Sequence, residues 1–254
     1  MRSHACSGYW TATETYEALK VYMDMDFDGL RSDIVQMLGG EHVSVNTRSF
    51  QNDMRTLKTK DDVLTLLIHL GYLAYDPVEK ETFIPNKEII DEFETAMSVS
   101  GWAEVVRVLK ASERLLADTL AGDGARVAEV LDKAHGEVAS ILTYNDENSL
   151  GCAIGLAYYS ARKDYMLIRE FPAGRGFADI VFLPLPSVSK PALVVELKYD
   201  RAADAAIQQI KDRKYPQTFN GYTGEILLVG INYDRENRNK PHGCLIERVE
   251  KTGK

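Results

Sequence analysis

The sequence predicts an α/β protein, with strands and helices in its second half and a mainly helical first half. Hydrophobic residues make up 45% of the 254 residues and charged residues 27%, the balance of an ordinary globular chain. Helical periodicity prevails up to about residue 143. Beyond that point, helical segments alternate with short runs that are apolar on both faces, as centrally buried strands are.

Two helices are expected early in the chain. The first begins near Thr11, which has Glu14 three residues later in the spacing of a capping box. In the second, Asp61 and Asp62 precede the apolar run VLTLLIHL, and acidic residues are favourable at a helix N-terminus. Gly71 stands where such a helix is expected to end.

A hairpin and a further helix complete this first part. Strand-like runs at 72–75 and 81–84 flank turn residues, and the helix is expected over 86–97. This order resembles a winged-helix module, to which residues 1–98 are assigned. Such a module can contact DNA, or it can serve packing and partner docking. The docking interpretation is favoured because the region is acidic and its hairpin offers only Lys80 as a cation.

Residues 99–140 are expected to connect the two parts. Helices are predicted over 103–120 and 126–142, and the glycines of AGDGA separate them. The following domain is predicted to span 141–254 and to contain a helix over 202–215 besides its strands. The expected strands are 165–170, 177–183, 193–199, 225–233 and 244–249.

Charge is unevenly distributed along the chain. Residues 1–143 carry 14 basic and 24 acidic side chains, whereas residues 144–254 carry 16 and 14. The acidic half suits a protein partner, and the second half can approach a polyanion despite the net charge of -8. No apolar stretch reaches the roughly 20 residues of a membrane span. Cys6, Cys152 and Cys244 are widely and irregularly spaced, which with the lack of a secretory leader predicts a cytoplasmic protein.

Two strands carry charges where a buried strand would be apolar. Asp179 interrupts the apolar run in GRGFADIVFLP, and Glu196 and Lys198 do the same in ALVVELKYD. The i, i+2 spacing of Glu196 and Lys198 puts both on one strand face. An unpaired carboxylate is costly to bury, so these acids are expected to pair, to neutralise or to bind a metal ion.

Two chemical interpretations fit this set of charges. Two carboxylates can hold a divalent cation, and Mg²⁺ prefers one or two carboxylates together with water and substrate phosphate oxygens. Lys198 can then orient or help to deprotonate an attacking water, or stabilise charge at phosphorus. The alternative is a buried ion pair between Lys198 and one acid. That pair would leave the second acid unexplained, and it is seldom a net gain in stability.

A further acid lies upstream of these strands. In TYNDENSLGCAIGLAYYSA, helical spacing places Glu147 on the stripe of Leu150 and Ile154, which is the apolar face. A glutamate in a first helical turn is commonly a capping or dipole-complementing residue. Both that role and a role as a ligand therefore stay open.

These residues together resemble a known family. Asp179 on one strand and the segment Glu196-Leu197-Lys198 on the next, preceded by Glu147 on a helix, resemble the PD-(D/E)XK nuclease superfamily. More closely, YNDEN, GFADIVFLP, VVELK and AIQQIKDRKY are similar to the nuclease domain at the C-terminus of bacterial AAA-ATPase-like proteins. SGYWTAT, GYLAYDP and IPN are similar to the segment before that domain. The resemblance implies a restriction-endonuclease-like mixed sheet with flanking helices.

The resemblance also implies roles for individual residues. Glu147, Asp179 and Glu196 would contribute metal ligands, together with the carbonyl of Leu197. Lys198 would be catalytic. The implied metal is Mg²⁺ or Mn²⁺.

Further positions are implied beside this core. Gln208 matches the polar position that such nucleases place next to the site. It shares a helical face with Lys211 and Tyr215, and a solvated helix face is the alternative for this trio. Arg175, in the turn before Asp179, is a candidate for phosphate contact.

The chain contains no G-x-x-x-x-G-K-[ST] phosphate loop, so ATP binding by that route is not expected. The sequence thus predicts a Mg²⁺- or Mn²⁺-dependent nuclease, acting on DNA by resemblance. The rival hypothesis is a catalytically inactive nuclease-fold module for docking or regulation, left after loss of an N-terminal ATPase domain. The complete set of acids and lysine favours the enzyme.

Overall fold

The computed structural model divides the chain into two compact units. The first unit comprises Met1–Met37 and Glu41–Val106, and the second comprises Leu38–Gly40 and Arg107–Lys254. The structure describes residues 19–25, 27, 29–48, 50, 57–99, 101–138, 141, 147–173, 176–213, 222, 224–237 and 241–249, without the side chains of 147–149 and 173.

The first unit joins helices to a small antiparallel sheet. Its elements after the helical residues 19–23 are α2 (Leu30–Leu38), β1 (Val43–Ser44), α3 (Lys60–His69), β2 (Ala74–Asp76), β3 (Glu81–Phe83) and α4 (Lys87–Ser98). The strand order is β1-β3-β2. Strands β2 and β3 form the predicted hairpin, in which Ala74 lies opposite Phe83.

Helix α3 begins and ends where its own sequence dictates. Thr59 and Asp62 form a capping box, because Thr59 Oγ1 accepts the Asp62 N–H at 3.2 Å and Asp62 Oδ2 accepts the Thr59 N–H at 3.0 Å. Gly71 follows the helix with a φ of 83°, a left-handed conformation that glycine adopts without strain. The cap predicted at Thr11 and Glu14 lies outside the described residues, and the winged-helix assignment of this unit stays a prediction.

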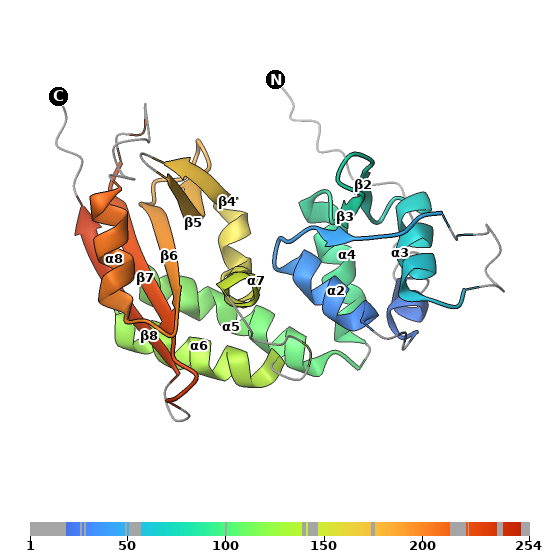
Figure 1. The fold of residues 1–254 in the computed structure, drawn as a ribbon, viewed down its shortest axis with the longest axis horizontal. Helices are drawn as coiled ribbons and strands as arrows, with labels where there is room; N and C mark the ends of the chain where they lie inside the picture. The colour runs from blue at the N-terminus through green and yellow to red at the C-terminus, as the bar shows by residue number, and fades with distance from the viewer. Residues whose placement is uncertain are drawn as a thin grey trace, which may run out of the picture. The chain divides into compact units, whose positions relative to one another are not determined.

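The second unit is built on a mixed five-stranded sheet (Figure 1). Its elements are α5 (Ala103–Leu120, which begins in the first unit), α6 (Gly124–Val138), α7 (Glu147–Ala157), a 3₁₀ segment (Tyr159–Lys163), β4 (Tyr165–Ala173), β5 (Gly176–Pro184), β6 (Ala192–Tyr199), α8 (Ala203–Asp212), β7 (Ile226–Tyr233) and β8 (His242–Val249). Strands β4 to β8 lie in chain order, with β6 and β7 parallel and the other neighbours antiparallel. The predicted α/β class is confirmed, and the sheet with its helices is consistent with a restriction-endonuclease-like fold.

Helices cover both faces of this sheet (Figure 1). Helix α8 packs against β6, β7 and β8 on one face. On the other face, α7 lies against β6 and α6 lies against β8. Strand alternation explains the division, because Glu196 and Lys198 of β6 share the α8 face whereas Leu197 points toward Gly151 of α7.

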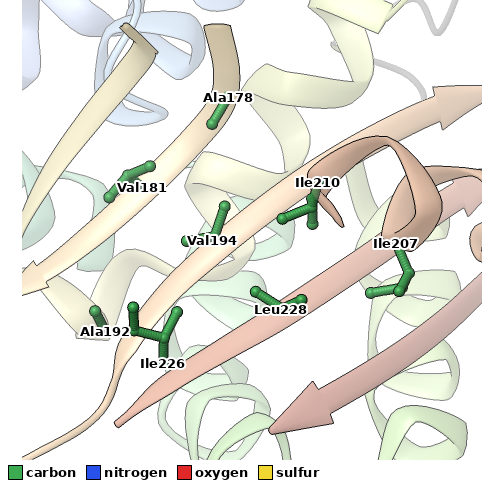
Figure 2. Packing of buried hydrophobic residues seen from close by; sticks show 8 residues of the cluster. All are labelled: Ala178, Val181, Ala192, Val194, Ile207, Ile210, Ile226 and Leu228. Carbon is green, nitrogen blue, oxygen red and sulfur yellow. The ribbon is translucent and has the colours of Figure 1, made fainter. Parts of the chain in front are cut away.

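A hydrophobic cluster under α8 holds this face together, as Figure 2 shows. Its members are Ala178, Val181, Ala192, Val194, Ile207, Ile210, Ile226 and Leu228. Each large aliphatic side chain that is fully buried contributes about 1.5–3 kcal/mol. The packing fixes α8 over β6 and so brings side chains of the helix close to Glu196 and Lys198.

The segment predicted as a connector, 99–140, contributes to the second unit. Helix α6 buries Val127, Leu131 and Val138. At Gly124 the helix comes so close to β8 that an added Cβ would lie 2.4 Å from the Cys244 carbonyl oxygen. The helix is therefore part of the layer that covers the sheet. None of the helices in the described part of the chain has the length and apolar character needed to cross a membrane.

Candidate active site

Strands β5 and β6 separate at the predicted acids. Their pairing covers three positions and ends where Ile180 faces Val195. At the next position the Asp179 side chain replaces a backbone acceptor, because its Oδ2 accepts the Leu197 N–H at 2.7 Å. Asp179 and Glu196 line the same cleft and are close enough for their charges to interact. The structure thus places two predicted acids side by side in the opening between two strands.

The Glu196 carboxylate is buried and incompletely hydrogen-bonded. Its side chain is 1% exposed. Oε1 accepts hydrogen bonds from Lys198 and from Gln209, whereas Oε2 is buried without a hydrogen-bond partner among the described residues. Leaving a charged oxygen in that state costs free energy. The site therefore favours either a proton or a cation at Glu196.

The protonation equilibrium of Glu196 reflects this environment. Burial raises the pKa of its carboxyl to about 7, and the negative charge of Asp179 contributes to the rise. The positive charges of Lys198 and Arg213 oppose it. Near neutral pH the carboxyl is thus poised between its charged and neutral forms.

Lys198 is held beside Glu196 by its own strand. Its side chain is 8% exposed, and Nζ donates to Glu196 Oε1 at 3.2 Å and to the Leu197 carbonyl oxygen at 2.8 Å. The ion pair considered from the sequence is therefore present, with Asp179 as a second acid next to it. The Leu197 oxygen has a second lone pair, which leaves capacity for a further partner.

The polar residue that α8 brings to these acids is Gln209. Its Nε2 donates to Glu196 Oε1. The predicted Gln208 is not brought into the cluster, because it is exposed and donates to Asp212 Oδ1 at 2.8 Å. Lys211, grouped with Gln208 from the sequence, pairs instead with Glu247 at 2.6 Å. The buried positions of α8 are 206, 207 and 210, and Gln209 adjoins this stripe. The helical spacing of the sequence could therefore have indicated Gln209 as the glutamine that faces the strands.

Several predicted residues lie where the structure gives no side-chain description. Glu147 is the first residue of α7, and its side chain is outside the described set, so its role as a third ligand stays a prediction. Arg175 and Tyr215 are outside the described residues altogether.

The acids and lysine line a cleft of about 720 Å³. Its charged lining residues are Glu170, Asp179, Glu196, Lys198, Arg201 and Arg213, and the aromatic ring of Phe177 lies among them. Sequence reasoning missed Glu170, Phe177, Arg201 and Arg213, which come from separate elements. Of these, Phe177 had a readable signal, since it precedes Asp179 by two residues on the same strand and so shares its face.

Glu170 has an unusual backbone conformation opposite Asp179. Its φ is 46°, although it lies within β4. The pairs on either side, Arg169 with Ile180 and Phe171 with Ala178, bracket Glu170 and Asp179. A left-handed residue that is not glycine costs roughly 1–3 kcal/mol and is commonly found at functional sites. The strain therefore coincides with the position of the candidate ligand Asp179.

The donor set fits a hard divalent cation in part. Asp179 and Glu196 supply carboxylates, the Leu197 carbonyl is adjacent, and the buried Glu196 Oε2 has no hydrogen-bond partner among the described residues. Mg²⁺ is commonly bound by one or two carboxylates with water completing its shell. Within the part of the chain whose side chains are described, no group of three or more His, Cys, Asp or Glu side chains converges on one point. The fit consequently rests on two acids.

One known protein family matches the part of the chain that contains these residues. Residues 147–243 match the family model described as the PD-(D/E)XK nuclease superfamily. The matched segment runs from the first residue of α7 into β8 and contains Asp179, Glu196 and Lys198. A search of curated protein sequences finds no match to the chain. The similarity to AAA-ATPase-like proteins therefore stays a prediction from sequence.

Proposed function

We propose that the second unit hydrolyses phosphodiester bonds of nucleic acid with the help of Mg²⁺ or Mn²⁺. The observation that carries this proposal is the buried Glu196 carboxylate, whose Oε2 has no hydrogen-bond partner among the described residues and which adjoins Asp179 at a cleft. The superfamily match over 147–243 supports a nuclease as the class of enzyme. DNA is the proposed substrate on the basis of the resemblance noted in the sequence.

Asp179 and Glu196 would hold the cation, with the Leu197 carbonyl and Glu147 as further proposed ligands. The cation would neutralise charge on the phosphate and lower the pKa of a bound water. The Leu197 N–H anchors the Asp179 carboxylate at 2.7 Å, so that this ligand is oriented before any ion arrives. Gln209 holds the other carboxylate from α8.

Lys198 would act on the reacting phosphate rather than on the cation. Its Nζ lies 2.8 Å from the Leu197 oxygen, and the residue lines the cleft. A positive charge with N–H donors at that point stabilises the negative charge that develops on phosphate oxygens during attack. The same hydrogen bonds can orient the attacking water.

A second candidate function is a docking or regulatory module without catalysis. The Lys198–Glu196 ion pair favours it, because that pair neutralises one acid without an ion. The acidic first half would then bind a protein partner. This candidate predicts no metal-dependent activity.

A cleavage assay distinguishes the two candidates. Labelled DNA is incubated with the purified chain and Mg²⁺, and the wild type is compared with Glu196→Gln and Lys198→Met. Both variants should lose at least about a hundredfold in rate, the usual scale for losing one group that stabilises transition-state charge. The matched controls are Glu247→Gln and Lys211→Met, which alter an exposed ion pair away from the cleft. Equal rates in all five proteins would refute the enzymatic proposal.

A further inference from the structure

The cleft wall beside Asp179 presents an exposed aromatic ring. Phe177 is 59% exposed and lines the cleft. Phe177 lies two residues before Asp179 on β5, and both residues line the cleft. The ring is therefore held next to the proposed reaction centre by a paired strand, in which Phe177 lies opposite Pro172.

A guanidinium group, that of Arg213, lines the same cleft. Arg213 follows α8 directly, and its side chain packs against Gly176, the residue before Phe177. A Cβ added at Gly176 would be 2.9 Å from Arg213 Nη1 and 3.2 Å from Cζ. The absence of a side chain at 176 thus makes room for the guanidinium beside the β4–β5 hairpin. The positive charge of Arg213 also opposes the rise in the pKa of Glu196.

The ring and the guanidinium match the two parts of one nucleotide. An arginine binds a phosphate through paired N–H donors. An aromatic ring stacks on a nucleobase, and the interaction tolerates any base because every base has a π face. In a continuous duplex both faces of a base are covered by its neighbours, so an outside ring reaches only unpaired or terminal bases.

The position of Phe177 argues for a base rather than an apolar protein partner. Other exposed large hydrophobic residues of this unit, Met166, Leu185 and Leu245, do not line the cleft. The cleft that Phe177 lines also contains three cations, Lys198, Arg201 and Arg213, beside its three acids. A ring in a cleft with cations suits a ligand that combines an aromatic face with negative charge.

We propose that Phe177 and Arg213 form a subsite for an unpaired nucleotide next to the cleaved phosphate, so that the substrate is single-stranded nucleic acid or a strand with an unpaired end. This inference rests on the proposed nuclease function and specifies its substrate class. Phe177 stacks on the base, and Arg213 binds the phosphate of the same strand.

The subsite can be tested by measuring the affinity for nucleic acid under conditions that prevent cleavage. Fluorescence anisotropy with EDTA present measures affinity for a labelled 20-nucleotide thymidine strand and for a blunt duplex. Phe177→Ala should weaken single-strand binding about tenfold and duplex binding less than twofold. Phe177→Trp should restore single-strand binding. Met166→Ala is the matched control, because Met166 is 52% exposed outside the cleft, and it should change neither affinity.

Two variants test the role of Arg213 in binding, one at Arg213 itself and one at the adjacent Gly176. Arg213→Ala should weaken binding of the single strand about tenfold, the scale of one lost charge-assisted hydrogen-bond pair. Gly176→Ala keeps the charge but displaces the guanidinium, and it should weaken the same complex in the same direction.

The outcomes separate this inference from the function on which it rests. A wild type that cleaves DNA, together with a Phe177→Ala variant that binds strand and duplex with unchanged or equally reduced affinity, would overturn the subsite and leave the nuclease proposal standing. A wild type that binds neither nucleic acid and cleaves neither would overturn both. Selective loss of single-strand binding in Phe177→Ala, restored by Phe177→Trp, would support the subsite.

Discussion

The Asp179 carboxylate takes the place of a main-chain acceptor for Leu197, at 2.7 Å from the amide nitrogen. Pairing between β5 and β6 ends just before this contact. This hydrogen bond therefore lies where the strand pairing ends, and it orients the carboxylate of a candidate ligand. Two replacements of Asp179 can separate the role of its hydrogen bond from the role of its negative charge.

Replacing Asp179 with asparagine should keep the opening and remove the charge. Asparagine retains an oxygen that can accept the Leu197 N–H, so Asp179→Asn should unfold at nearly the wild-type denaturant concentration. Asp179→Ala leaves a donor without its acceptor and should lose about 1–3 kcal/mol of unfolding free energy. Urea denaturation measures both. If the two variants are equally stable, the hydrogen bond does not support the strand opening.

Metal binding should depend on both carboxylates. Calorimetric titration of the EDTA-treated protein with Mn²⁺ should show binding in the wild type and a loss of at least about tenfold in affinity in Asp179→Asn and Glu196→Gln. Glu247→Gln, at an exposed ion pair, should bind like the wild type. A wild type that takes up no Mn²⁺ would favour the non-catalytic module.

The metal-free protein should lose stability as pH rises toward neutrality. Burial raises the folded-state pKa of Glu196 to about 7 from an ordinary value of 4.5, so the folded protein holds a proton that the unfolded chain releases in this window. The stability that the bound proton contributes is fully present below about pH 4.5 and is lost as the pH rises through 7. At 1.36 kcal/mol per pH unit, the loss of unfolding free energy amounts to at most about 3 kcal/mol.

The comparison that isolates this effect uses Glu196→Gln, which cannot titrate. Thermal unfolding of both proteins in EDTA between pH 5 and 8 should show the wild type falling relative to the variant as pH rises. A difference between them that stays constant across this range would contradict a raised pKa at Glu196.

Adjacent glutamines on α8 should behave differently. Gln209 donates to Glu196, whereas Gln208 is exposed and donates to Asp212. Gln209→Ala should reduce the cleavage rate about tenfold, because hydrogen bonds to charged groups contribute about 1.5–3 kcal/mol. Gln208→Ala should stay within twofold of the wild type in the same assay. The reverse ranking would restore the role that the sequence predicts for Gln208.

The packing of α8 should be measurable as stability. Ile210 is fully buried in the cluster of Figure 2. Ile210→Ala should cost about 2–5 kcal/mol of unfolding free energy, and the loss should appear in the transition of the second unit. Lys211→Ala, the next residue and exposed, should cost less than about 1 kcal/mol. A small loss at Ile210 would mean that the helix is held mainly by other contacts.

The sequence alone determined the α/β class, the central strands and three of the charged residues at the cleft. Alternation within one strand reveals Glu196 and Lys198 as charges on a buried face, and an apolar run reveals Asp179 as its interruption. These signals are local, because each depends on neighbours only a few residues away.

The tertiary structure decided what surrounds those charges. The choice of Gln209 over Gln208 depends on how α8 packs on β6. The presence of Phe177 and Arg213 in one cleft depends on the contact between Gly176 of β5 and the end of α8. Glu170 faces Asp179 only through strand register. Contacts between segments distant in sequence depend on how helices pack and on how two strands pair, and the pattern within one segment does not specify its partner.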